Sequence, residues 1–149
     1  MLRTVHAVAG ALVFVLLLAF LGTTVVAELL LTEQALVCVK RAIAWAMALY
    51  VPLLLLTWAS GAALGPADDP VVARKRRRTH LVVVKGVVVL VPLAIFLYLR
   101  ARAGAVDALF YTVQAAELVV GAANAVLVGL NIRDGVRLRA RDRRLGGRA

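Results

Sequence analysis

Long apolar runs, separated by short polar segments, dominate the hydropathy pattern of the chain. The runs lie at about 4–31, 42–63, 81–99 and 108–132. Each is near the roughly 20 residues that a helix needs to cross a bilayer. They lack the alternation of barrel strands, and a helix satisfies its own backbone hydrogen bonds inside lipid. The pattern predicts an all-α, polytopic integral membrane protein, an antiparallel bundle of four transmembrane helices that forms a single domain over 1–149.

The segments between the runs predict how the helices connect. Short segments at 32–41 and 100–107 predict tight turns, so the first two and the last two helices should form antiparallel hairpins. The segment 64–80 is longer and polar. In it, Asp69 followed by Pro70 is typical of a helix N-cap and its first position, so a helix is expected to run from there into the third span. The tail 133–149 is expected to continue the fourth helix.

Composition excludes other classes of protein, and the charge distribution predicts orientation. The chain is 63% hydrophobic and 17% charged, whereas soluble domains are about 45–50% apolar and about 25% charged. Disordered chains are poor in apolar residues. Of the 18 Lys and Arg residues, 13 fall at the N-terminus, in 64–80 or in the tail. The positive-inside rule then predicts a multi-pass protein of a bacterial-type inner (plasma) membrane, with both termini and the loop 64–80 in the cytoplasm.

The fourth run carries polar and small residues at helical spacing. They are Gln114, Glu117, Gly121, Asn124, Val128 and Asn131. Steps of three and four residues place them on one helix face, which lipid would not tolerate. One interpretation is packing, against the chain's own helices or against another subunit. The other is a functional site for a proton, an ion or a cofactor. With Lys85, the polar members Gln114, Glu117, Asn124 and Asn131 form the predicted intramembrane polar site.

Lys85 and Glu117 are the charged residues that interrupt the third and fourth apolar runs, while the first run is uncharged from Ala7 to Ala27. Glu117 is expected near the middle of its helix and, because burial disfavours a charge, to be neutral near pH 7 unless it meets a cation. Lys85 is expected about one turn inside the cytoplasmic edge, level with Asn124 rather than Glu117, or with its amine reaching the headgroups. Lys40 falls in the predicted turn, where it or its neighbour Arg41 would pair with exposed carboxylates such as Glu28.

Histidines raise the alternative of a haem site. His6 and His80 begin the first and third runs, which are parallel, so the two imidazoles should share a depth. Two histidines at one depth suit the axial positions of haem b. With the helix number, they loosely resemble the small cytochrome b anchor subunits of respiratory enzymes, although the second histidine pair of dihaem bundles is absent. We otherwise expect no cofactor, and the single Cys38 excludes an internal disulfide or a Cys-rich metal site.

Basic residues in the loop 64–80 and in the tail 133–149 are predicted to bind anionic lipid headgroups or a partner. These are Arg74, Lys75, Arg76, Arg77, Arg78, Arg133, Arg137, Arg141 and Arg144. Each basic residue near a membrane surface contributes about 1 kcal/mol of attraction to anionic lipid. Nucleic acid is not expected as a partner, because no aromatic residue lies between the basic ones. A second membrane protein or another copy of the chain is expected instead.

Three functional hypotheses follow. The first is a non-enzymatic membrane subunit, anchor or accessory protein of a larger assembly, because little of the chain lies outside the apolar runs. The second is a small proton- or ion-coupled transporter or channel that uses Glu117, Asn124 and Lys85. The third is a b-type cytochrome electron carrier with His6 and His80 as haem ligands. No phosphate-binding loop, HExxH or GxSxG motif points to an enzyme.

Overall fold

A computed structural model describes residues 1–30, 32–64 and 70–146, with side chains through Arg141. Its elements are α1 (Leu2–Leu30), α2 (Glu33–Ala63), α3 (Pro70–Val84), the π-helical η1 (Lys85–Leu90), α4 (Val91–Arg102) and α5 (Ala108–Gly146). The segments α3, η1 and α4 form one continuous rod. In the described part, all four resulting rods are long and apolar enough to cross a membrane, and no strand occurs. The all-α prediction with four candidate spans is confirmed.

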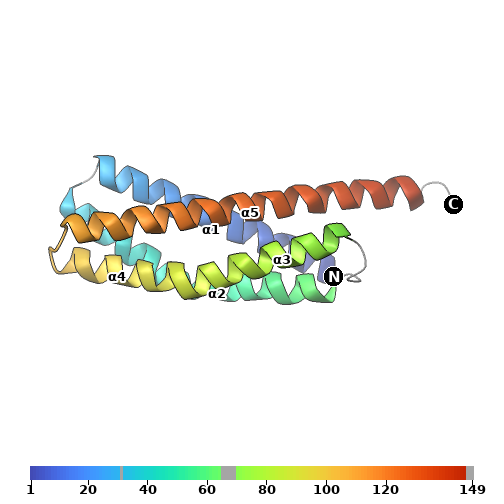
Figure 1. Cartoon of the computed structure of the whole chain (residues 1–149), viewed down its shortest axis with the longest axis horizontal. Helices are drawn as coiled ribbons and strands as arrows, with labels where there is room; N and C mark the ends of the chain where they lie inside the picture. Colours follow the sequence, from blue (N-terminus) through green and yellow to red (C-terminus); the bar gives the residue numbers. More distant parts are fainter. Residues whose placement is uncertain (31, 65–69, 147–149) are drawn as a thin grey trace.

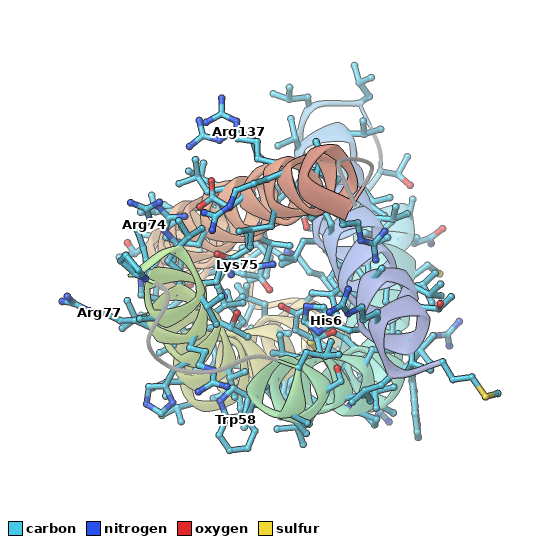
Figure 2. All side chains as sticks on the ribbon, turned by 90° about the vertical axis from the view of Figure 1, so that its right-hand side faces the viewer. His6, Trp58, Arg74, Lys75, Arg77 and Arg137 are labelled. Atoms are coloured by element: carbon cyan, nitrogen blue, oxygen red, sulfur yellow. The ribbon has the colours of Figure 1, made fainter. Side chains whose placement is uncertain are left out.

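The rods lie side by side in alternating directions (Figure 1). Both short turns lie at one end of the bundle, which we name the turn end. The N-terminus and the last residues of α5 lie at the other end, which we name the terminal end. Viewed along the bundle, α1 borders α2 and α5, and so does the α3–η1–α4 rod (Figure 2). Helix α1 and this rod therefore occupy opposite corners.

Helix α2 begins earlier than predicted. The hydroxyl of Thr32 accepts a hydrogen bond from the Ala35 backbone N–H at 3.4 Å, which caps the helix. Glu33 adds an acidic side chain in the first turn, where the helix dipole favours negative charge. The prediction of a tight turn over 32–41 is therefore wrong for 33–41, which is helical. The correction matters because it makes Lys40 a helical residue.

A second turn joins α4 to α5 through residues 103–107. Gly104 supplies its left-handed backbone, with φ of 68°. Asp107 caps α5, because its Oδ1 accepts the backbone N–H of Phe110 at 3.1 Å. Arg100 donates to Oδ2 of the same carboxylate. Helix α3 starts at Pro70, as expected, while the predicted N-cap Asp69 lies outside the described residues.

The Asp107 cap predicts a pH-dependent contribution to stability. The hydrogen bond from Arg100, and then that from the Phe110 N–H, lowers the pKa of Asp107. The carboxylate therefore stabilises the fold above its unfolded pKa of about 3.9, and this stabilisation is lost as the pH falls through the lower folded pKa. We expect Asp107→Asn to melt at a lower temperature than the wild type at neutral pH in detergent. The difference should shrink under acid, and an equal difference at both pH values would contradict this assignment.

A π-helical segment lies immediately before Pro92. Proline has no N–H, so it leaves the carbonyl four residues earlier without its usual donor. Over Lys85–Leu90 the helix widens, and the Val91 N–H bonds to the Gly86 carbonyl. The interruption of the helical hydrogen bonds at Pro92 is thus accommodated by a π-helical segment, a common outcome at such positions.

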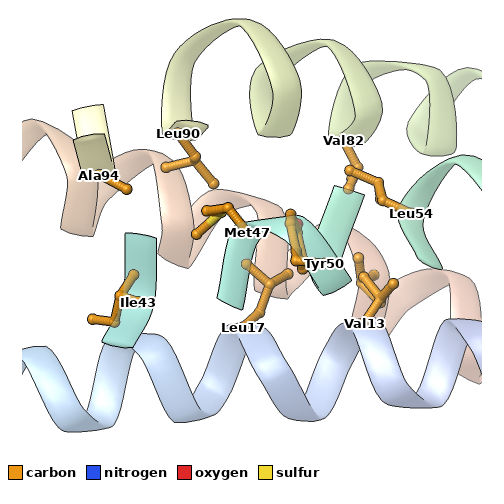
Figure 3. Packing of buried hydrophobic residues seen from close by; sticks show 10 residues of the cluster. Val13, Leu17, Ile43, Met47, Tyr50, Leu54, Val82, Leu90 and Ala94 are labelled. Carbon is orange, nitrogen blue, oxygen red and sulfur yellow. The ribbon is translucent and has the colours of Figure 1, made fainter. Parts of the chain in front are cut away.

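The main core lies at mid-bundle, where all four rods contribute buried apolar side chains. Leu17 of α1, Met47 and Tyr50 of α2, and Leu90 of η1 are buried together (Figure 3). A Cβ added to Gly86 would lie 2.8 Å from Leu54 Cδ2, so glycine permits η1 to approach α2 closely. Many large apolar side chains on the outer faces stay exposed, Trp45 at 74% and Val119 at 69% among them. An apolar exterior around a filled interior is the arrangement that lipid requires.

Candidate functional site

A buried ion pair joins α2 to α5. Lys40 Nζ lies 3.2 Å from Glu117 Oε2, and the two side chains are only 1% and 12% exposed. Burial of both groups removes most of the water that would screen them, so each depends on the other for compensation of its charge. The sequence interpretation made Glu117 neutral unless it met a cation. The structure supplies that cation from another helix.

Lys40 reaches the interior because it occupies a core position of α2. The buried residues of this helix are Leu36, Lys40, Ile43, Met47, Tyr50, Leu54 and Ser60. Up to Leu54 they follow steps of four and three, which define one inward face. Sequence reasoning missed this lysine because the helix was expected to begin at Ala42. Extending the same spacing backward from Ile43 would have found it.

Lys85 was expected either beside Asn124 or with its amine reaching the headgroups, and the structure does not pair it with Asn124. It is half-buried in η1, and within the described part of the chain no hydrogen bond or ion pair involves its amine. Asn124, its expected neighbour, donates from Nδ2 to the Val82 carbonyl at 3.3 Å instead. The expected Lys85–Asn124 pairing is therefore wrong. The bond from Asn124 ties α5 to α3.

The polar stripe of α5 faces the chain's own helices. Gln114 is 3% exposed and Asn124 is fully buried. Asn131 donates to the Thr79 hydroxyl of α3 at 2.9 Å. A Cβ on Gly121 would lie 3.1 Å from the Leu21 side chain, so α1 also approaches this face closely. These contacts support the interpretation in which the stripe packs against the chain's own helices.

Glu28 adds a second carboxyl group beside the ion pair. It belongs to α1, near the turn end, and it interacts electrostatically with both Lys40 and Glu117. Its Oε1 is buried and has no hydrogen-bond partner among the described residues. The side chain of Gln114, one turn from Glu117, likewise has neither its oxygen nor its nitrogen bonded within the described part. Charged and polar side chains of α1, α2 and α5 therefore lie in the turn-end half of the bundle.

A small cavity adjoins Glu117 toward the bundle centre. It has a volume of about 30 Å³, and its polar lining comes from Thr24, Tyr50 and Glu117. The Tyr50 hydroxyl is buried and has no hydrogen-bond partner in the described structure. A water molecule needs at least about 10–15 Å³ of such space and two or more polar partners. The cavity meets both requirements, and it is too small for an organic substrate.

No family model, curated protein or solved structure matches this chain. The assignment of function consequently depends on the geometry of the chain itself.

The two histidines do not form a haem site. His6 Nδ1 lies 3.1 Å from both the Thr57 carbonyl and Ser60 Oγ on α2. Gly61 makes room for the ring, because a Cβ there would lie 3.0 Å from His6 Cε1. His80 is exposed, and its helix stands at the opposite corner from α1 (Figure 2). The parallel course of their helices predicted a common depth for the two residues. His6 is turned toward α2 and His80 is exposed, however, so the two imidazoles do not fit the axial positions of one haem b.

The basic residues near the terminal end divide into paired and outward groups. Asp134 of α5, which is 4% exposed, accepts a hydrogen bond from Arg78 at 2.8 Å and lies 3.9 Å from Arg74. Arg76 donates to the Ala62 carbonyl at 2.7 Å. Lys75 points toward the bundle axis in Figure 2. Lys75, Arg76 and Arg78 thus make contacts within the chain, whereas the Arg74 side chain stays 55% exposed.

The remaining basic residues point outward. Arg77 and Arg137 project from the bundle in Figure 2. Arg133 is about half-exposed and lies 3.7 Å from Asp134, while Arg141 is exposed. The side chain of Arg144 lies outside the described residues. No cluster of three or more His, Cys, Asp or Glu side chains suited to a metal occurs in the described part.

Proposed function

We propose that the protein is a non-enzymatic integral membrane subunit that anchors a basic helical arm at the membrane surface. One observation carries the proposal. Helix α5 has 39 residues, or roughly 58 Å at about 1.5 Å per residue. The hydrocarbon core of a bilayer is only about 30 Å thick. The helix therefore projects beyond the other rods at the terminal end (Figure 1).

The arm offers positive charge to a partner outside the apolar layer. Arg137, Arg139 and Arg141 are exposed along it, and Arg139 reaches the Arg3 carbonyl at 3.4 Å. Such a helix attracts anionic lipid headgroups and acidic protein surfaces. The interior supports the same function, because the α5 stripe is engaged with the chain's own helices and the cavity has room only for water. By the positive-inside rule the arm faces the cytoplasm of a bacterial-type inner membrane.

Removal of residues 138–149 tests the anchor function. Full-length protein purified in mild detergent is expected to retain a stoichiometric partner protein or bound anionic lipid, detected by native mass spectrometry. The truncated protein is expected to lose it, because the truncation removes positive charge from the arm. The control is Arg41→Ala with Arg102→Ala, which removes exposed charge from the turn-end half of the bundle.

Recovery of the full-length chain alone, or identical retention by the truncated protein, would remove support for the anchor.

A second candidate, a small proton- or ion-coupled transporter, is favoured by the Lys40–Glu117 pair in place of the expected Lys85. Proton flux into liposomes that contain the wild type but not Glu117→Gln would support that candidate instead. The electron-carrier hypothesis is not carried forward, because His6 and His80 do not face each other.

A further inference from the structure

The turn-end half of the bundle brings two carboxyl groups near one buried ammonium group. Glu28 of α1, Lys40 of α2 and Glu117 of α5 meet there, which brings two carboxyl groups to one ammonium. If all three were ionised, the site would carry one uncompensated negative charge. An uncompensated charge in an apolar interior is costly, and proteins avoid it by taking up or releasing a proton.

Within the described part of the chain, Lys40 is the cation that forms an ion pair with either carboxyl group. The buried residues that η1 and α4 present toward mid-bundle and the turn end include Leu90, Ala94 and Leu97, which are apolar. Arg100 of α4 is held by Asp107 at the turn. On α2, Glu33 and Arg41 are exposed. The Lys85 amine makes no ion pair in the described part of the chain.

The contacts distinguish the two carboxyl groups. Glu117 is 3.2 Å from the Lys40 ammonium, so it is the carboxylate whose charge is compensated. Glu28 has a buried oxygen without a hydrogen-bond partner in the described structure. We propose that Glu28, Lys40 and Glu117 form a proton-binding site, in which Glu28 holds one exchangeable proton beside the Lys40–Glu117 pair. This goes beyond the anchor function and does not depend on it.

The exchange is a simple acid–base step. A hydronium ion at the turn end transfers its proton to a Glu28 carboxylate oxygen, an O–H bond forms, and neutral water leaves. Release is the reverse reaction. Glu28 lies two residues before the end of α1 at Leu30, about 3 Å along the axis, so the path to the surface is short.

The neighbouring cavity supplies water to the other side of the site. Its volume of about 30 Å³ adjoins Glu117, and the buried Tyr50 hydroxyl also lines it. A water molecule there would accept a hydrogen bond from Tyr50 and donate one to the Glu117 carboxylate. The Lys40–Glu117 pair is thereby hydrated on the side away from Glu28. A purely structural ion pair would need neither the second carboxyl group nor this space.

Infrared spectroscopy of the full-length protein in lipid nanodiscs tests the site. The wild type is expected to show a protonated-carboxyl band near neutral pH that shifts in D₂O and disappears as the pH rises. Glu28→Gln should abolish this band. Glu117→Gln should also abolish it, because Lys40 then compensates an ionised Glu28. The exposed Glu33→Gln is the matched control, and it should keep the band unchanged.

The variants also separate protonation from hydration. Tyr50→Phe should alter the carboxylate bands of Glu117 if water bridges the two groups, and an unchanged spectrum would overturn the hydrated cavity. Absence of a D₂O-sensitive carboxyl band in the wild type, or its survival in Glu28→Gln, would overturn the proton site. The wild-type titration decides the matter even if a variant does not fold, and it does not depend on whether a partner co-purifies.

Discussion

Lys40→Met is expected to destabilise the bundle by about 3–5 kcal/mol, since removal of one partner from a buried ion pair leaves an uncompensated charge. The substitution retains an unbranched side chain but removes the ammonium that lies 3.2 Å from Glu117. Glu117 must then take up a proton or draw in water, and both cost free energy. The free energy of unfolding can be measured by titration with a denaturing detergent, with helicity as the signal.

The neighbouring arginine provides the control. Arg41 is exposed on the same helix, so Arg41→Met should change stability by no more than about 0.5 kcal/mol. Combining Lys40→Met with Glu117→Leu should recover most of the loss, because apolar replacement of both partners removes the buried charge. If Lys40→Met destabilised no more than Arg41→Met, the pair would have no structural role.

Gly86→Val is expected to destabilise the fold by about 1–3 kcal/mol, the usual cost of overpacking a core. A Cβ at this position would lie 2.8 Å from Leu54 Cδ2. Leu54 is 1% exposed, so its side chain has little space into which to move. The helix α2 and the rod that contains η1 would separate, which would lower the thermal midpoint in detergent.

Gly22→Val is the matched substitution, because nothing lies within 4 Å of the Cβ position of Gly22. Both variants change glycine to valine within a helical segment, so their difference reports the contact with Leu54 rather than helix propensity. Equal midpoints for the two variants would show that η1 and α2 do not depend on this close approach.

The order of the rods was predictable because membrane length is a one-dimensional constraint. Runs of roughly 20 apolar residues can be recognised in the sequence alone. In its described part, the structure has four helical rods over these runs. The start of α2 was not predictable by the same rule. The polar segment 33–41 looks like a turn by hydropathy, but its cap at Thr32 and its inward spacing make it helical.

The sequence predicted the polar face of α5 in the candidate site but not the partner of Glu117. The spacing of Gln114, Glu117, Asn124 and Asn131 showed that they share a face, and the structure places that face inside the bundle. The partner of Glu117 was misassigned, because counting residues from the turns gives depth but not direction around a helix. Residue counting likewise placed His6 and His80 at the same depth, whereas the two side chains point in different directions around their helix axes.

The sequence by itself determined the helical class, the number and positions of the apolar rods, and the concentration of positive charge near the termini. These properties depend on composition and spacing along one dimension. Only the tertiary structure decided that Lys40 pairs with Glu117, that Glu28 interacts electrostatically with both, and that Asp134 pairs with Arg74 and Arg78 of α3. Such pairings depend on how each rod is rotated against its neighbours, which close packing of many side chains decides together.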